Sequence, residues 1–133
     1  MSGEREVVIA GSADVVGVRQ LVRSLAVEVG LSLVDQTKII TAASELARNA
    51  LVYAGGGDVR MEVVQKGLRR GLKLVFSDEG PGIPDLEQAL TDGWTTGGGL
   101  GLGLGGSRRL VDEFDLVSEP GKGTTVTVTK WSR

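Results

Sequence analysis

The feature that most constrains the fold of this 133-residue chain is a glycine stretch, residues 97–106, in which seven of ten positions are glycine. Each glycine inside a helix costs about 1 kcal/mol relative to alanine, so several together need a reason. A flexible linker is one explanation, but a solvated linker has no use for Leu100, Leu102 and Leu104, which alternate with the glycines. Backbone N–H groups at a helix start bind phosphate, and glycine lets the phosphate approach. The stretch therefore predicts a phosphate-binding loop that runs into a helix ending near Glu113.

Two common nucleotide-binding motifs do not explain this stretch. Gly101, Gly103 and Gly106 satisfy the pattern G-x-G-x-x-G, but that pattern must follow a strand in a strand–helix–strand unit. The preceding residues 93–96 do not read as a strand, and the pattern G-x-x-x-x-G-K-[ST] is absent. Rossmann and P-loop domains are therefore rejected.

The rest of the chain predicts one domain, residues 1–133, of the α/β (α+β) class. Hydrophobic periodicity and capping residues predict helices and strands in the order β-α-α-β-β-α-α-β-β, which is not a regular βαβ alternation. The expected strands are 7–10, 59–64, 72–76, 116–118 and 124–131, and the expected helices are 13–29, 33–54, 85–92 and 100–113, with Ser12 and Ser32 as N-caps of the first two. This order predicts a two-layer sandwich, in which helices cover one face of a mixed, mostly antiparallel sheet.

Glu45 and Asn49 are four residues apart in the second helix, on the side opposite its apolar face. A carboxylate beside an amide oxygen suits a general base next to a ligand for a hard cation. From spacing alone, a solvated helix face is the commoner explanation. Asn49 weakens it, because asparagine is a poor residue for a helix interior. Arg48 shares this polar face and is a candidate phosphate contact, or an ordinary surface residue.

Residues 78–82, Asp-Glu-Gly-Pro-Gly, follow a strand directly. The strand end would hold the Asp78 carboxylate in place, and Gly80 and Gly82 would let a flat ligand lie against the backbone. A fixed carboxylate can accept a hydrogen bond from an amine such as that of adenine. An ordinary Pro-Gly turn explains the segment equally well.

The composition excludes several classes of chemistry and partner. There is no Cys and no His, so a general base would be a carboxylate or Lys, and metal ligands would be oxygens that favour Mg²⁺ or Ca²⁺. Fifteen basic and seventeen acidic residues give a net charge of −2, which argues against nucleic acid and offers little attraction to a membrane. No apolar run nears the ~20 residues that span a bilayer, and residues 1–6 do not resemble a signal peptide. We expect a cytoplasmic protein.

Four motifs in order carry a family resemblance. Glu45-x-x-x-Asn49, Asp78-x-Gly80-x-Gly82, the glycines of 97–103 and Gly123-Thr124 resemble the N, G1, G2 and G3 boxes of the GHKL ATPase/kinase superfamily, which has the Bergerat ATP-binding fold. The likeness covers nearly the whole chain, from residue 34 to Lys130-Trp131. Within the superfamily it is to the serine/threonine switch kinases of bacterial stressosomes.

The resemblance implies ATP and Mg²⁺ as cofactors and a role for each matching residue. Asn49 would hold Mg²⁺, Glu45 would accept the proton of the attacking hydroxyl, and Asp78 would bind the adenine amine with support from Thr124. The glycines would line the adenine pocket (Gly80 and Gly82) and form the lid over the phosphates (Gly97, Gly98, Gly99, Gly101 and Gly103). Many relatives carry a basic residue in the lid, but none lies between Asp85 and Ser107, so Arg108 and Arg109 are the first candidates to meet the γ-phosphate.

By the same resemblance, the chain would phosphorylate STAS-domain proteins of a stressosome core and then activate a PP2C-type phosphatase. Three alternatives stay open: an ATP-binding anti-sigma factor of the same superfamily, an ATP-driven conformational protein of another GHKL branch, and a structural domain with chance motifs. The second usually needs further domains, and four ordered motifs rarely arise by chance. Because a basic lid residue is missing, slow turnover is expected.

Overall fold

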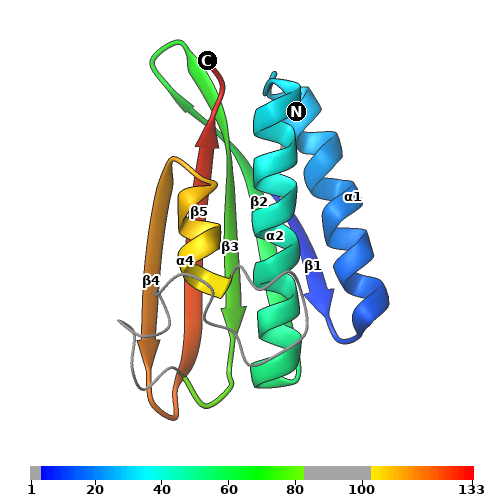
Figure 1. Cartoon of the computed structure of the whole chain (residues 1–133), viewed down its shortest axis with the longest axis vertical. Helices are drawn as coiled ribbons and strands as arrows, with labels where there is room; N and C mark the ends of the chain where they lie inside the picture. Colours follow the sequence, from blue (N-terminus) through cyan, green and yellow to red (C-terminus); the bar gives the residue numbers. More distant parts are fainter. Residues whose placement is uncertain (1–3, 83–102) are drawn as a thin grey trace.

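The structure is a computed structural model that describes residues 4–82 and 103–133. These residues form three helices and five strands (Figure 1). In chain order they are β1 (Arg5–Ile9), α1 (Ser12–Glu28), α2 (Leu33–Ala54), β2 (Gly57–Lys66), β3 (Arg69–Asp78), α4 (Gly103–Arg109), β4 (Glu113–Glu119) and β5 (Gly123–Trp131). The expected helix 85–92 and the loop that follows it lie outside the described residues.

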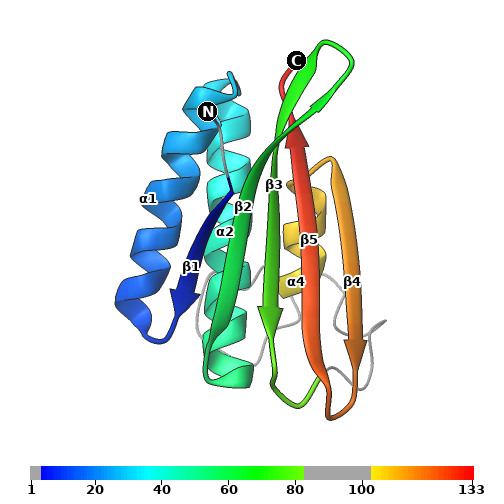
Figure 2. The same cartoon turned by 180° about the vertical axis from the view of Figure 1, so that it is seen from behind.

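The five strands form one sheet in the order β1-β2-β3-β5-β4. All three described helices cover the same face of this sheet, and Figure 2 shows the other face from behind. The predicted two-layer sandwich is therefore confirmed. The expectation of a mixed sheet is wrong for the described strands, because each of their pairings is antiparallel.

The core lies between the sheet and the helices, and it is built by alternation along the strands. On β3, Leu72, Leu74 and Phe76 are buried against the helices, and Val126 and Val128 occupy the same face of β5. The residues between them point to the uncovered face. Burying a side chain of this size stabilises the fold by about 1.5–3 kcal/mol, so this alternation fixes the register of the central strands.

The two long helices begin differently. Ser32 caps α2 as predicted, since its Oγ accepts a hydrogen bond from the N–H of Asp35 at 3.1 Å. The prediction for Ser12 is wrong, because the N-cap of α1 is Gly11. Gly11 has no side chain to accept a hydrogen bond, and the N–H of Asp14 bonds to the carbonyl of Gly11 at 3.0 Å instead. The Asp14 carboxylate in turn accepts hydrogen bonds from the N–H groups of Ala10 at 2.8 Å and Gly11 at 3.0 Å, which ties the first turn to the residues before it.

The helix after the glycine stretch is shorter than predicted. It ends at Arg109 rather than Glu113, and a turn follows in which the N–H of Leu110 bonds to the carbonyl of Ser107 at 3.1 Å. The N–H of Asp112 then donates to the carbonyl of Thr129 at 3.0 Å. Because residue 113 pairs with β5, β4 begins there, three residues before the start of the predicted strand 116–118.

Candidate functional site

Asp78 is the last residue of β3, and its carboxylate is fixed from two directions. Its Oδ1 atom accepts a hydrogen bond from the N–H of Gly80 at 3.0 Å and another from the N–H of Thr124 at 3.2 Å. The first bond holds the carboxylate to its own loop, and the second holds it to the start of β5. In the described part of the chain no group donates a hydrogen bond to Oδ2, so that oxygen can accept one from a ligand.

The glycines around Asp78 allow backbones to approach more closely than a side chain would permit. A Cβ added to Gly80 would lie 2.5 Å from the Cβ of Ala54, so the loop packs directly on the end of α2. Gly82 has φ +78°, and an added Cβ would collide with the carbonyl of Glu119. Both glycines are therefore required by the local geometry, and the positive φ of Gly82 after Pro81 is also what an ordinary Pro-Gly turn requires.

Thr124 completes this corner of the site from the neighbouring hairpin. Its hydroxyl shares a hydrogen bond with Ser118 Oγ at 2.9 Å, across the antiparallel pair of β4 and β5. Gly123, with φ +89°, brings its backbone against the carbonyl of Asp78. The predicted residues Asp78, Gly80 and Thr124 are thus in direct contact, although they come from distant parts of the sequence.

Glu45 is buried, with 4% of its surface exposed, whereas Asn49 is half-buried and Arg48 is exposed. The solvated-face explanation is therefore wrong for Glu45. The physical reason is that α2 lies between α1 and α4 on the sheet, so more of its circumference is covered than an isolated helix pattern indicates (Figure 1). Among the described residues no hydrogen bond or ion pair occupies the Glu45 carboxylate.

Four of the predicted glycines, Gly97, Gly98, Gly99 and Gly101, lie outside the described residues. Gly103 is the first residue of α4, so the glycine stretch does lead into a helix. Arg108 is exposed near the end of that helix, and Arg109, which ends it, makes a polar contact.

The structure contains a hollow of about 410 Å³ beside Asp78, at the ends of β2, β3 and α2. It is lined by Gly55, Gly56 and Gly57 among others, and neither Glu45 nor Asn49 reaches it. The hollow by itself is therefore not the predicted nucleotide site.

No cluster of three or more His, Cys, Asp or Glu side chains able to hold a metal ion occurs within residues 4–82 and 103–133. A divalent cation here would therefore take most of its oxygen ligands from phosphate and water, as Mg²⁺ commonly does. Asn49 offers a single amide oxygen that would add to such a set. Of the helices that the structure describes, none is both long and apolar enough to cross a membrane.

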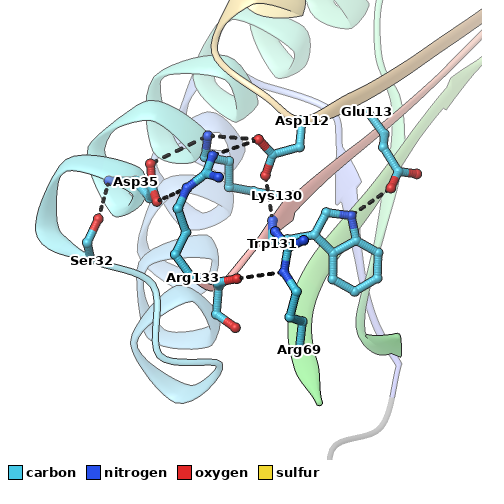
Figure 3. A network of polar contacts seen from close by, with 9 residues as sticks. Ser32, Asp35, Arg69, Asp112, Glu113, Lys130, Trp131 and Arg133 are labelled. Carbon is cyan, nitrogen blue, oxygen red and sulfur yellow. Dashed lines mark hydrogen bonds and ion pairs between the residues drawn. The ribbon is translucent and has the colours of Figure 1, made fainter. Parts of the chain in front are cut away.

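Sequence reasoning missed a charge network around Lys130 at the opposite end of the sheet (Figure 3). Lys130 pairs with Asp35 and Asp112, and Arg133 contacts the same two carboxylates. One signal was available in the sequence: Lys130 continues the buried series of Val126 and Val128, so an alternating strand places it on the core face.

Comparison with known proteins identifies what this arrangement is similar to. Residues 34–132 match the family model HATPase_c, described as histidine kinase-, DNA gyrase B- and HSP90-like ATPase. The serine/threonine-protein kinase RsbT of Bacillus subtilis is 50% identical over 120 residues, which is 90% of each chain. The anti-sigma F factor of Thermoanaerobacter sp. (strain X514) is 30% identical over 118 residues, covering 85% of this chain and 82% of that protein.

Two solved structures share the fold. The RsbU and RsbW domains of Rv1364c from Mycobacterium tuberculosis superpose with a TM-score of 0.66 at 22% identity, covering 99% of this chain, which spans 33% of that larger protein. The mycobacterial sensor histidine kinase MprB superposes with a TM-score of 0.52 at 18% identity, covering 100% of this chain and 99% of that one.

Proposed function

Because this chain belongs to the HATPase_c family of ATPases and is an RsbT-like serine/threonine-protein kinase that binds ATP, we propose a specific role for each residue of its site. The observation that carries the proposal is the double anchoring of Asp78 by the N–H groups of Gly80 and Thr124. A carboxylate held in this way keeps one oxygen in a constant position for a ligand.

Asp78 would recognise adenine. Its Oδ2 atom would accept a hydrogen bond from the exocyclic amine, and a bond to a charged acceptor is stronger than one between neutral groups. Gly80 and Gly82 would let the flat base lie close to the backbone at this point. Thr124 would support the adenine end through its N–H bond to Asp78.

Glu45 would act as the general base. The Ser or Thr hydroxyl oxygen of the substrate forms a bond to the γ-phosphorus, the bond from that phosphorus to the β–γ bridging oxygen breaks, and the hydroxyl proton passes to Glu45. ADP leaves with the electron pair of the broken bond. Burial of Glu45 supports this role, because water does not solvate the carboxylate freely there.

Asn49 would bind Mg²⁺ through its amide oxygen, one helical turn after Glu45 and on the same face of α2. The cation would neutralise charge on the phosphates during transfer. The glycines Gly97, Gly98, Gly99, Gly101 and Gly103 would close over the phosphates, with Arg48 and Arg108 as further phosphate contacts. Without a basic residue in the closing segment, turnover would be slow.

For the partners, we infer STAS-domain proteins of a stressosome as substrates and a PP2C-type phosphatase as the target activated afterwards. The support is the 50% identity with RsbT over 90% of each chain. The proposed reaction would take place in the cytoplasm, where ATP is available. The alternative is an anti-sigma factor, supported by 30% identity with the anti-sigma F factor, so the kinase has the closer sequence likeness.

The test is incubation of the purified protein with radiolabelled ATP, Mg²⁺ and a panel of STAS-domain proteins. At a Mg²⁺ concentration that is limiting for the wild type, label on Ser or Thr is expected for the wild type and not for Glu45→Ala or Asn49→Ala. Glu28→Gln, an exposed carboxylate at the end of α1, is the matched control and should label as the wild type does. ATP binding without label on any panel member would reject these substrates, and capture of a sigma factor by the same sample would favour the alternative.

A further inference from the structure

Lys130 is a buried lysine on the core side of β5, with 3% of its surface exposed. Its Nζ atom lies 3.4 Å from Asp35 Oδ1 and 3.4 Å from Asp112 Oδ1 (Figure 3). Asp35 is itself 6% exposed. One ammonium group therefore bridges two carboxylates that are 77 positions apart in the chain (112 − 35).

One carboxylate lies in the first turn of α2, and the other lies just beyond the end of α4. Asp35 is the third residue of α2, and its N–H is bound by the Ser32 cap. Asp112 follows the end of α4 by three residues, and it also accepts the N–H of Trp131 at 2.8 Å. Figure 1 shows that the start of α2 and the end of α4 lie at the same end of the molecule as the end of β5. Lys130 thus links the start of one helix to the turn that ends the other.

Stability alone is a poor explanation for this bridge. Removing a lysine and a carboxylate from water is costly, and apolar side chains of similar volume often replace buried ion pairs without loss of stability. The network is neutral, since Arg133 adds a second positive charge with contacts of 3.5 Å to Asp35 and 3.0 Å to Asp112. The side chain of Arg133 is 62% exposed, so Lys130 is the buried cation of the group. An ion pair fixes the geometry of the groups it joins, whereas an apolar contact does not.

The linked helices carry the two halves of the proposed site. α2 bears Glu45 and Asn49, and α4 begins at Gly103, within the glycine stretch. The two helices pack on each other, with Leu104 and Ser107 buried in α4. A shift of α4 along α2 would therefore move Gly103 relative to Asn49.

We propose that Lys130 is a positioning residue, whose ion pairs with Asp35 and Asp112 hold α4 in place on α2 and so set the affinity for ATP. This inference rests on the proposed function of the site. Lys130 would not contact ATP, because it pairs with Leu72 near the start of β3, whereas Asp78 is at the other end of that strand.

The test removes the two ion pairs of Lys130, with Asp35 and with Asp112, one at a time. Asp35→Asn and Asp112→Asn should each raise the dissociation constant for ATP about tenfold, as expected when a binding group is displaced by a fraction of an ångström. The double variant should be about as weak as either single one, because either change already frees α4. Lys130→Arg should keep the affinity near that of the wild type, whereas Lys130→Met should lose it. The affinities are measured by calorimetry, well below the melting temperature of each variant.

Glu113→Gln is the matched control, since Glu113 accepts the Trp131 Nε1–H at 2.6 Å in the same region without linking the helices. It should leave the ATP affinity unchanged. Hydrogen exchange without nucleotide gives a second reading: Asp35→Asn should speed exchange in residues 103–109 more than in the β2–β3 hairpin. A purely stabilising network would lower the melting temperature but leave both the affinity and this local exchange unchanged.

The two proposals can fail separately. If the wild type binds ATP and both single Asn variants bind it equally well, the inference about Lys130 is wrong and the proposed function stands. If Asp35→Asn and Asp112→Asn leave the exchange of residues 103–109 at the wild-type rate, Lys130 does not hold α4, whatever the ATP result. If the wild type binds no ATP, the proposed function fails, and the inference fails with it. Should Lys130→Met not fold, the two Asn variants still decide the question.

Discussion

The carboxylate of Asp78 accepts a hydrogen bond from the N–H of Thr124 at 3.2 Å, although the two residues are 46 positions apart along the chain. The bond joins the end of β3 to the start of β5, which pair side by side in the sheet. The Asp78 side chain is thereby fixed before any ligand arrives. Little conformational entropy remains to be lost when a ligand binds to its second oxygen.

Asp78→Asn should weaken ATP binding by about 10- to 100-fold, since a hydrogen bond to a charged acceptor contributes about 1.5–3 kcal/mol. Asparagine keeps the shape of the side chain but loses the charge. Calorimetric titration with ATP measures the effect, and Glu79→Gln, an exposed neighbouring carboxylate, is the control. An equal loss in both variants would mean that net charge, and not recognition by Asp78, governs the affinity.

Gly123→Ala should destabilise the fold far more than Gly121→Ala. Both glycines have positive φ, +89° and +79°, so each substitution carries a backbone penalty of about 1–2 kcal/mol. An added Cβ at Gly121 meets nothing within 4 Å, whereas at Gly123 it would collide with the carbonyl of Asp78. Urea unfolding of the two variants isolates the cost of this collision, and equal losses would show that the close approach to Asp78 is unimportant.

Asn49→Ala should raise the Mg²⁺ concentration needed for half-maximal phosphoryl transfer, because the cation would lose its protein ligand. Asn49→Asp, which keeps an oxygen at the same place, should bring that Mg²⁺ concentration part of the way back to the wild-type value. Removing divalent cations with EDTA should abolish transfer in the wild type. An unchanged Mg²⁺ titration in Asn49→Ala would show that the metal does not bind at this residue.

Local rules were sufficient to predict much of the fold. The alternation of Val126 and Val128 with threonine predicted β5, and the hydroxyl of Ser32 predicted the start of α2, because each depends only on nearby residues. Where the prediction was wrong, distant contacts decided the outcome. Residue 113 belongs to β4 because pairing with β5 begins there, which no periodicity within residues 100–113 could indicate.

For the candidate site too, local patterns were predicted and contacts between distant residues were not. Asp78 was identified because a carboxylate at a strand end followed by two glycines is a local pattern, but its bond to Thr124 depends on the order of strands in the sheet. The burial of Glu45 was not evident from a helical wheel, since it depends on the position of α2 between two other helices. The bridge at Lys130 joins three segments that are far apart in the sequence, so only the fold reveals it.

Acid should destabilise this protein partly through Asp112. Burial raises the pKa of the Asp112 carboxyl, but the N–H of Trp131 and the charges of Lys130 and Arg133 outweigh it, so the pKa lies below its usual value. A carboxyl with a lowered pKa in the folded state stabilises the fold above its unfolded pKa of about 3.9. That stabilisation is lost as the pH falls through the lower pKa of the folded state.

Asp112→Asn should therefore be less stable than the wild type at pH 7, and the difference should shrink steadily as the pH falls below about 4. Urea unfolding between pH 7 and pH 2 measures both curves. Asp115→Asn is the matched control, because Asp115 is an exposed carboxylate of β4, three residues further along the chain, without an ion pair to any described residue. The difference in free energy of unfolding between Asp112→Asn and the wild type could instead stay constant with pH. In that case Asp112 stabilises the fold through its shape and neutral hydrogen bonds, and its charge contributes nothing through Lys130 and Arg133.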